Sequence, residues 1–164
     1  MDKLFSTLYH VTFFVNDIEK SLDFYKKLGF DVLFDLRVSP EKDPWNIFVS
    51  VAPNQTIELQ PVKAEKPFPA PDAPRVYPDQ TFFHAALLCD DLEATIKDLW
   101  ARGITVWTDP GKHGEVHSAA EAFDSPDGCL VAWVVDPDGN PFEIMQQQEG
   151  KSLQAAGDKE KYGC

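Results

Sequence analysis

The chain has 164 residues, a length typical of one domain, and 43% of them are hydrophobic and 26% charged. Its 27 acidic and 15 basic side chains give a formal net charge of −12. Because this charge repels phosphate groups and anionic lipid, we expect no binding to nucleic acid or membranes. No apolar run could span a bilayer, and nothing resembles an export signal. The three scattered cysteines predict a cytoplasmic protein without a disulfide framework.

The sequence repeats itself at a constant offset of 74 residues, so that the segment 9–19 aligns with 83–93. The offset continues into the residues that follow each segment. Identical residues that align are His10 with His84, Asp17 with Asp91, Glu19 with Glu93, and Gly29 with Gly103. We therefore expect two copies of one structural unit.

The first copy predicts a strand, a helix and then three more strands. The strand is expected at 8–15, where β-branched and aromatic residues gather, and a capping-box-like pair, Asn16 and Glu19, predicts the start of the helix. Gly29 suits the left-handed residue that ends a helix. The apolar stripe of the helix comprises Ile18, Leu22, Tyr25 and Leu28, and the three further strands are expected at 31–38, 46–52 and 56–62.

The second copy predicts the same order of elements. Asp90 and Glu93 would begin its helix, and Asp136-Pro137-Asp138-Gly139-Asn140 predicts a tight turn between the last two strands. The apolar stripe comprises Leu92, Ile96, Leu99 and Trp100, and the three later strands are expected at 104–108, 129–136 and 141–147. Between them, 109–128 is expected to be a long loop with a short strand at 116–123.

These elements predict an α+β fold made of two tandem βαβββ modules in a single domain over 1–164. Module 1 would cover about 7–62 and module 2 about 81–147. The proline-rich segment between them, about 63–80, is predicted to be a linker, and 148–164 is predicted to be a tail.

In both copies a His opens the unit and a Glu closes it. His10 lies on the first predicted strand of module 1 and Glu58 on the last; His84 and Glu143 hold the same places in module 2. If the first and last strands of each module are adjacent, each His lies beside its Glu. Two imidazoles and two carboxylates suit a divalent Ni, Co or Zn ion, with Mn or Fe as alternatives. A single His on a strand is more often a core or surface residue, but chance would have to place both pairs equivalently.

The sequence resembles the vicinal oxygen chelate superfamily, which includes glyoxalase I, bleomycin-resistance proteins and extradiol dioxygenases. The resemblance covers roughly 7–147. It is carried by His10-Val11-Thr12, Asp17 to Tyr25, Leu28-Gly29-Phe30, Ile57-Glu58-Leu59, His84 and the segment Asp136 to Glu143. It implies paired modules that form a cupped mixed sheet around a metal site.

The four-ligand set His10, Glu58, His84 and Glu143 is most similar to that of glyoxalase I. It implies a metal-dependent lyase or isomerase in which a metal-site carboxylate, Glu143 or Glu58, takes a proton beside a chelated carbonyl of a small molecule. We favour Glu143; the alternative base is a metal-bound hydroxide, with both Glu residues as permanent ligands. The other functions to consider are an extradiol-type dioxygenase and a non-enzymatic small-molecule binding or resistance protein.

The expected substrate differs from that of glyoxalase I. That family usually carries an Arg four residues beyond its first His, where this chain has Phe14. We therefore do not expect a glutathione adduct. Loop residues His113 and His117 are further candidates for the rim of the pocket. Relatives of the superfamily commonly pair, which predicts a homodimer.

Overall fold

The structure is a computed structural model that describes residues 10–37, 43–44, 46–53, 55–62, 84–126 and 128–151. The linker expected at 63–80 and most of the expected tail lie outside these residues. The chain divides into two compact units. Unit 1 comprises Met1–Arg75 and Asp136–Asn140, and unit 2 comprises Val76–Val135 and Pro141–Cys164. The turn at 136–140, predicted as part of module 2, groups with unit 1.

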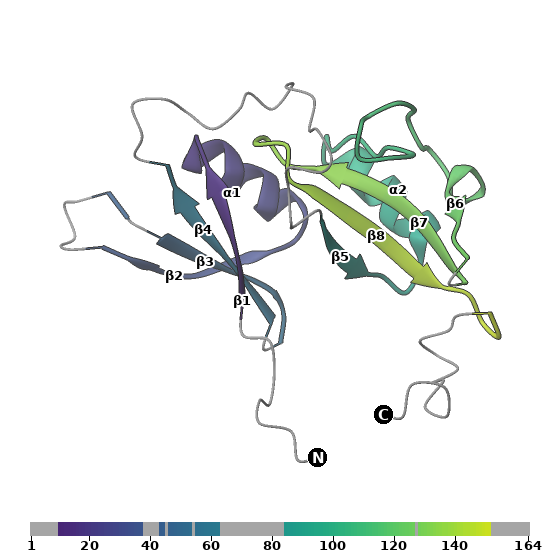
Figure 1. The fold of residues 1–164 in the computed structure, drawn as a ribbon, viewed down its shortest axis with the longest axis horizontal. Helices are drawn as coiled ribbons and strands as arrows, with labels where there is room; N and C mark the ends of the chain where they lie inside the picture. Colours follow the sequence, from purple (N-terminus) through teal and green to yellow (C-terminus); the bar gives the residue numbers. More distant parts are fainter. Residues whose placement is uncertain are drawn as a thin grey trace, which may run out of the picture. The chain divides into compact units, whose positions relative to one another are not determined.

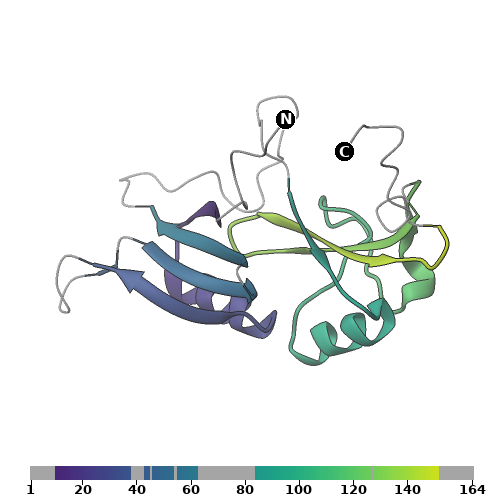
Figure 2. The same ribbon diagram turned by 90° about the horizontal axis from the view of Figure 1, so that it is seen from below.

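Unit 1 is a four-stranded sheet with one helix across a face (Figure 1; Figure 2). The strand order is β1-β4-β3-β2, with β1 and β4 parallel and the other neighbours antiparallel. Its elements are β1 (His10–Val15), α1 (Ile18–Lys27), β2 (Asp31–Leu36), β3 (Asn46–Ala52) and β4 (Gln55–Pro61). The first and last strands are therefore adjacent, as the His–Glu pairing requires.

The alternation along the strands separates the core of unit 1 from its open face. Phe13, Val15 and Leu59 point to the helix side and are at most 4% exposed. Side chains one position away along the same strands, among them Thr12 and Glu58, point to the opposite face of the sheet. The helix side is thus the hydrophobic core, and the polar candidates lie on the other face.

Unit 2 repeats the arrangement with the strand order β5-β8-β7-β6 and a parallel pair, β5 and β8. Its elements are β5 (Ala85–Leu88), α2 (Leu92–Ala101), the 3-10 helix η1 (Ala119–Glu121), β6 (Phe123–Asp124), β7 (Cys129–Val135) and β8 (Pro141–Gln147). Leu92, Ile96 and Leu99 of the predicted stripe are buried. The prediction of an α+β fold from two βαβββ modules is confirmed.

Both helices begin one residue later than the sequence predicts. Asp17 is the N-cap of α1 and accepts a hydrogen bond from the backbone N–H of Lys20; Asp91 does the same for α2 toward Ala94. A carboxylate at this position satisfies one of the first backbone N–H groups of a helix and suits its positive end. Asn16, expected as the cap, instead donates to the Asp138 carboxylate. The prediction that a glycine ends each helix is confirmed. Gly29, with a φ of 91°, has the left-handed backbone conformation, and Gly103 also has a positive φ.

The strand expected at 104–108 is wrong. Trp107 alone forms a bridge, with Trp133 of β7 and with Glu115. The pairing with β7 does not continue, because the chain turns back on itself after Trp107. The backbone N–H of Thr108 donates to the carbonyl of Gly114. The short strand expected at 116–123 is also wrong, because the 3-10 helix η1 occupies its middle and β6 begins only at Phe123.

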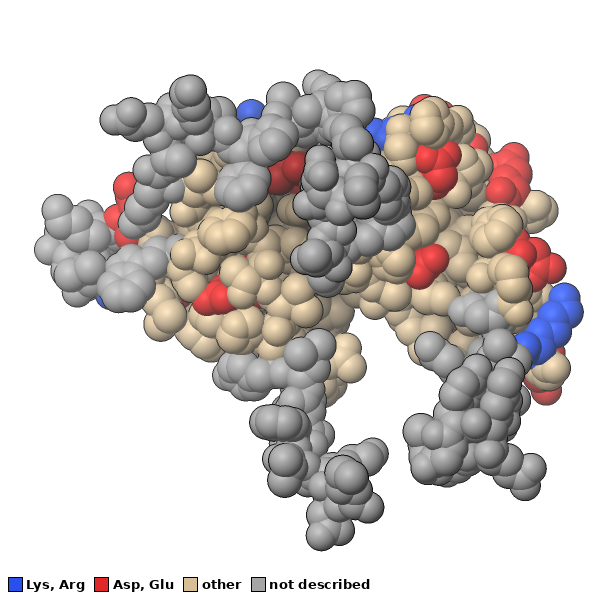
Figure 3. All heavy atoms as spheres, in the orientation of Figure 1, with Lys and Arg blue, Asp and Glu red and all other residues tan. Residues whose placement is uncertain are grey.

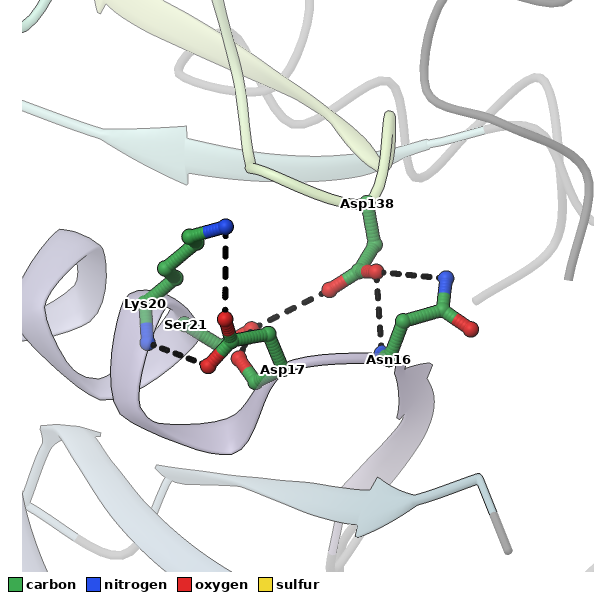
Figure 4. A network of polar contacts seen from close by, with 5 residues as sticks. All are labelled: Asn16, Asp17, Lys20, Ser21 and Asp138. Carbon is green, nitrogen blue, oxygen red and sulfur yellow. Dashed lines mark hydrogen bonds and ion pairs between the residues drawn. The ribbon is translucent and has the colours of Figure 1, made fainter. Parts of the chain in front are cut away.

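The turn between β7 and β8 packs against the start of α1. The Asp138 carboxylate accepts from the backbone and side-chain N–H groups of Asn16 at 2.9 Å each, and from the Ser21 hydroxyl at 3.1 Å (Figure 4). The turn therefore does more than reverse the chain: it supplies acceptors to the beginning of the helix.

A second carboxylate of the turn is buried in unit 1. Asp136 is 1% exposed and accepts the hydroxyl of Tyr25, itself fully buried, at 2.9 Å. Its other partners are the backbone N–H groups of Asp138 and Asn140 and the Asn140 side chain. Burial raises the pKa of the Asp136 carboxyl above its usual value, and the hydrogen bonds from Asn140 and Tyr25 oppose that rise.

We expect Tyr25→Phe to destabilise the protein by about 1–3 kcal/mol at neutral pH, since a buried carboxylate loses a donor. A carboxyl with a raised folded pKa stabilises the fold below its unfolded pKa, and this contribution is lost as the pH rises through the folded pKa. Tyr25→Phe raises the Asp136 pKa further, so its cost should be smaller in acid than at neutral pH. Urea unfolding of the wild-type protein and Tyr25→Phe, in acid and at neutral pH, measures the loss of unfolding free energy. An equal loss at both pH values would contradict the prediction.

Acidic side chains are scattered over the described surface of each unit on the face drawn in Figure 3, and they do not gather into one patch. No helix among the described residues combines the length and apolarity that crossing a membrane requires. Of the cysteines that the structure describes, Cys89 and Cys129 are not in a disulfide.

Candidate metal-binding half-sites

In unit 1, His10 and Glu58 lie beside each other on the open face of the sheet. Their strands, β1 and β4, are parallel neighbours in which Thr12 is directly opposite Glu58. The distance from the His10 Nε2 to the Glu58 Oε2 is 3.4 Å. The side chain of Glu58 is 12% exposed and that of His10 is 32% exposed. The pair predicted from the sequence is therefore brought together.

Unit 2 contains the same pair on the equivalent strand β8 and at the residue just before β5. The His84 Nε2 lies 3.4 Å from the Glu143 Oε2, and the two side chains are 30% and 18% exposed. The agreement with unit 1 in distance and exposure extends the repeat from sequence to side-chain geometry.

Each imidazole also rests with its edge toward an aromatic ring. His10 meets Phe48 at a centroid distance of 5.4 Å, and His84 meets Trp133 at 5.0 Å, both nearly perpendicular. Phe48 and Trp133 hold equivalent places, because each is opposite the Glu of its unit on the neighbouring antiparallel strand. The Nδ1 atoms of both histidines are buried, which leaves Nε2 as the nitrogen that faces the carboxylate.

The Glu58 carboxylate has further partners in unit 1. The Thr12 hydroxyl donates to Oε2, and the side-chain amide of Asn46 donates to Oε1. Asn46 was missed by the sequence analysis, because only the pairing of β3 with β4 places it near Glu58. Thr12 was named only as part of the segment His10-Val11-Thr12, with no role toward Glu58.

The donor atoms of each pair fit two ligands of one divalent ion. Donors about 2.0–2.2 Å from an ion lie about 2.8–3.6 Å apart at octahedral to tetrahedral angles, which includes the observed 3.4 Å. Within the described residues, no group of three or more His, Cys, Asp or Glu side chains could hold a metal. Each unit by itself therefore supplies a two-donor half-site.

The loop histidines have separate partners. His113 pairs with Asp109 at 2.9 Å, and His117 pairs with Glu115 at 3.3 Å while its ring stacks on Trp100. Both side chains are more than half exposed. The structure gives them local roles in the loop.

A cavity of about 840 Å³ in unit 1 lies between α1 and the sheet, away from the His–Glu pair. Ile18, Leu22, Phe30 and Ile47 supply its apolar lining. Neither His10 nor Glu58 lines it, so this cavity is separate from the His–Glu pair of unit 1.

The protein is thus a tandem repeat of two βαβββ units, and each unit has a His and a Glu side by side on or next to a parallel strand pair. The chain belongs to the Glyoxalase/Bleomycin resistance protein/Dioxygenase superfamily, whose sequence pattern matches residues 7–144.

The chain is similar to a lactoylglutathione lyase, GLX1 of Arabidopsis thaliana, with 26% identity over 143 residues. These residues are 84% of this chain but 43% of the lyase, so the chain spans less than half the length of this curated relative.

Two solved structures show the same fold. A glyoxalase family protein from Enterococcus faecalis is 24% identical, with a TM-score of 0.64 over 87% of this chain and 99% of that one. TnmS3, an antibiotic binding protein from Streptomyces sp. CB03234, is 24% identical, with a TM-score of 0.59 over 90% of this chain and all of that one.

Proposed function

We propose that this protein is a divalent-metal-dependent lyase or isomerase of glyoxalase I type, acting on a small carbonyl compound. The observation that carries the proposal is the repeated His–Glu pair, with the same 3.4 Å separation of Nε2 and Oε2 in both units. His10, Glu58, His84 and Glu143 would hold one ion, whether the two half-sites come from one chain or from two copies. The similarity to a lactoylglutathione lyase supports this class of reaction.

Bound there, the ion would polarise the substrate carbonyl and stabilise the negative charge that develops when a neighbouring C–H loses its proton. Nickel, cobalt or zinc suits a set of two imidazoles and two carboxylates, whose charges balance the ion. Glu143 is the proposed general base, taking the proton from the carbon next to the carbonyl and returning it to the adjacent position.

The side chains near Glu58 favour an apolar or aromatic group on the substrate. Phe34 stacks on Phe48 at a centroid distance of 4.6 Å, and Phe48 in turn contacts His10. Phe14, on the same strand face as His10, is 49% exposed, and Phe34 is 46% exposed. Such rings bind planar carbon groups better than they bind the charged ends of glutathione.

The proposal is tested by metal analysis of the purified protein followed by turnover assays. One nickel, cobalt or zinc ion per pair of half-sites is expected, with conversion of hemithioacetals of phenylglyoxal and methylglyoxal with small thiols, the phenyl compound being preferred. Bound iron with oxygen consumption would instead indicate a dioxygenase. Absence of bound metal, together with no uptake of added metal, would favour a binding protein and refute the proposal.

We also propose a homodimer formed through the edge of the unit 1 sheet. The edge strand β2 is exposed along its whole length, including Val32, Leu33, Phe34 and Leu36, which are 43–50% exposed. An exposed apolar edge strand favours pairing with another chain.

We expect light scattering to give twice the mass of one chain, and Leu33→Lys to shift the protein toward monomer. Ala101→Lys, at an exposed residue of helix α2 away from any strand edge, is the control and should leave the dimer intact. A monomeric wild-type protein at micromolar concentration would contradict the prediction.

A further inference from the structure

The two half-sites hold their carboxylates differently. In unit 1 Glu58 is 9% exposed and accepts hydrogen bonds from both neighbouring strands. Thr12 of β1 donates to Oε2, and Asn46 of β3 donates to Oε1. Thr12 lies directly opposite Glu58, and Asn46 lies two residues before Phe48, the residue opposite Glu58 on β3. Both oxygens of this carboxylate are thus engaged by protein donors.

The equivalent positions of unit 2 carry no side-chain donor. Ala86 lies directly opposite Glu143 on β5, and Val131 lies two residues before Trp133, which is opposite Glu143 on β7. A methyl and an isopropyl group cannot donate hydrogen bonds. The two units therefore have equivalent His, Glu and aromatic residues. They differ at the two positions whose side chains donate to the Glu of unit 1.

We infer that Thr12 and Asn46 are positioning residues that fix Glu58 as a stationary, single-oxygen metal ligand. The inference rests on the proposed function. The Oε2 that faces His10 is the oxygen placed to bind an ion, and the Asn46 amide keeps Oε1 turned away from it. The β-branched Thr12 side chain, stiff about its first torsion, holds Oε2 in place.

The alternative is that Thr12 and Asn46 serve only the fold. A carboxylate that is largely removed from water needs donors, whether or not it binds a metal. In that case their removal would lower stability but would not change the way a metal binds. The test must therefore read the metal site itself.

Cobalt(II) is a suitable probe, because its visible absorption reports the number and geometry of its ligands. We expect Thr12→Val and Asn46→Leu each to weaken Co²⁺ binding by about 10–100-fold, the usual effect of removing a group that orients a ligand, and to change the spectrum. Thr12→Ser, which keeps the hydroxyl, should restore both. Ser50→Ala is the matched control, since its hydroxyl, also on β3, bonds the carbonyl of Ala52 instead.

The outcomes separate this inference from the proposed function. Wild-type protein that fails to bind Co²⁺ overturns both. If wild-type protein binds Co²⁺ and folded Thr12→Val and Asn46→Leu bind it with unchanged affinity and spectrum, the inference alone is overturned. Should either variant fail to fold by circular dichroism, Thr12→Ala and Asn46→Ala make the same measurement with smaller side chains. Equal loss in Ser50→Ala would also count against a specific role.

Discussion

Replacing Glu143 with Gln is expected to lower kcat by about 10²–10⁴-fold, the usual cost of losing a general base, while most of the bound metal is retained. The amide keeps the shape of the side chain and an oxygen that can face the ion, but it cannot accept the proton. Glu58→Gln should show the opposite balance, with weaker metal binding as the first effect, because its oxygen is held by Thr12 and Asn46. Metal content and kcat, measured together on both variants, test this.

The result that would reverse these roles is an active Glu143→Gln and an inactive, metal-loaded Glu58→Gln. If both variants turned over substrate at nearly the wild-type rate, proton abstraction by either carboxylate would be wrong. Activity should also fall on acidification, because protons compete with the metal for imidazole and carboxylate ligands and occupy the base.

The second large effect is expected for the histidines. His10→Ala and His84→Ala should each reduce metal affinity by at least about tenfold with a near-native circular dichroism spectrum, since each ligand lies on the partly open face of a formed sheet rather than in the core. His113→Ala and His117→Ala are matched controls, because both side chains are exposed and paired within the loop.

Loss of affinity in only one of the two variants would show that the half-sites do not share an ion. Unchanged metal content in both would exclude the four-ligand set. A loss of the same size in the loop controls would point to a general effect of removing histidine.

The repeat made the fold and the two His–Glu pairs predictable. A constant offset aligned His10 with His84, and the period of two along the strands placed each His on the face of its Glu. What joined them was the adjacency of first and last strands, and the structure confirms it in both units. Local signals of this kind need only the sequence and the geometry of strands.

The residues that distinguish the two units were not predictable in the same way. Asn46 reaches Glu58 only because β3 pairs with β4 in one particular register, and a strand residue does not reveal its register from its own sequence. The helix starts were misplaced by one residue because Asn16 and Asp17 are both good caps. Asp17 is the cap of α1, and Asn16 donates instead to Asp138, a residue 122 positions later in the chain.

The buried turn has a consequence for how the protein is made. Tyr25, Ser21 and Asn16 lie in the first third of the chain, yet their acceptors at Asp136 and Asp138 are translated more than a hundred residues later. The first βαβββ segment emerging from the ribosome would bury the Tyr25 hydroxyl without its carboxylate partner. A fragment ending in the linker should therefore fold poorly by itself, and adding the second half as a separate polypeptide should rescue it.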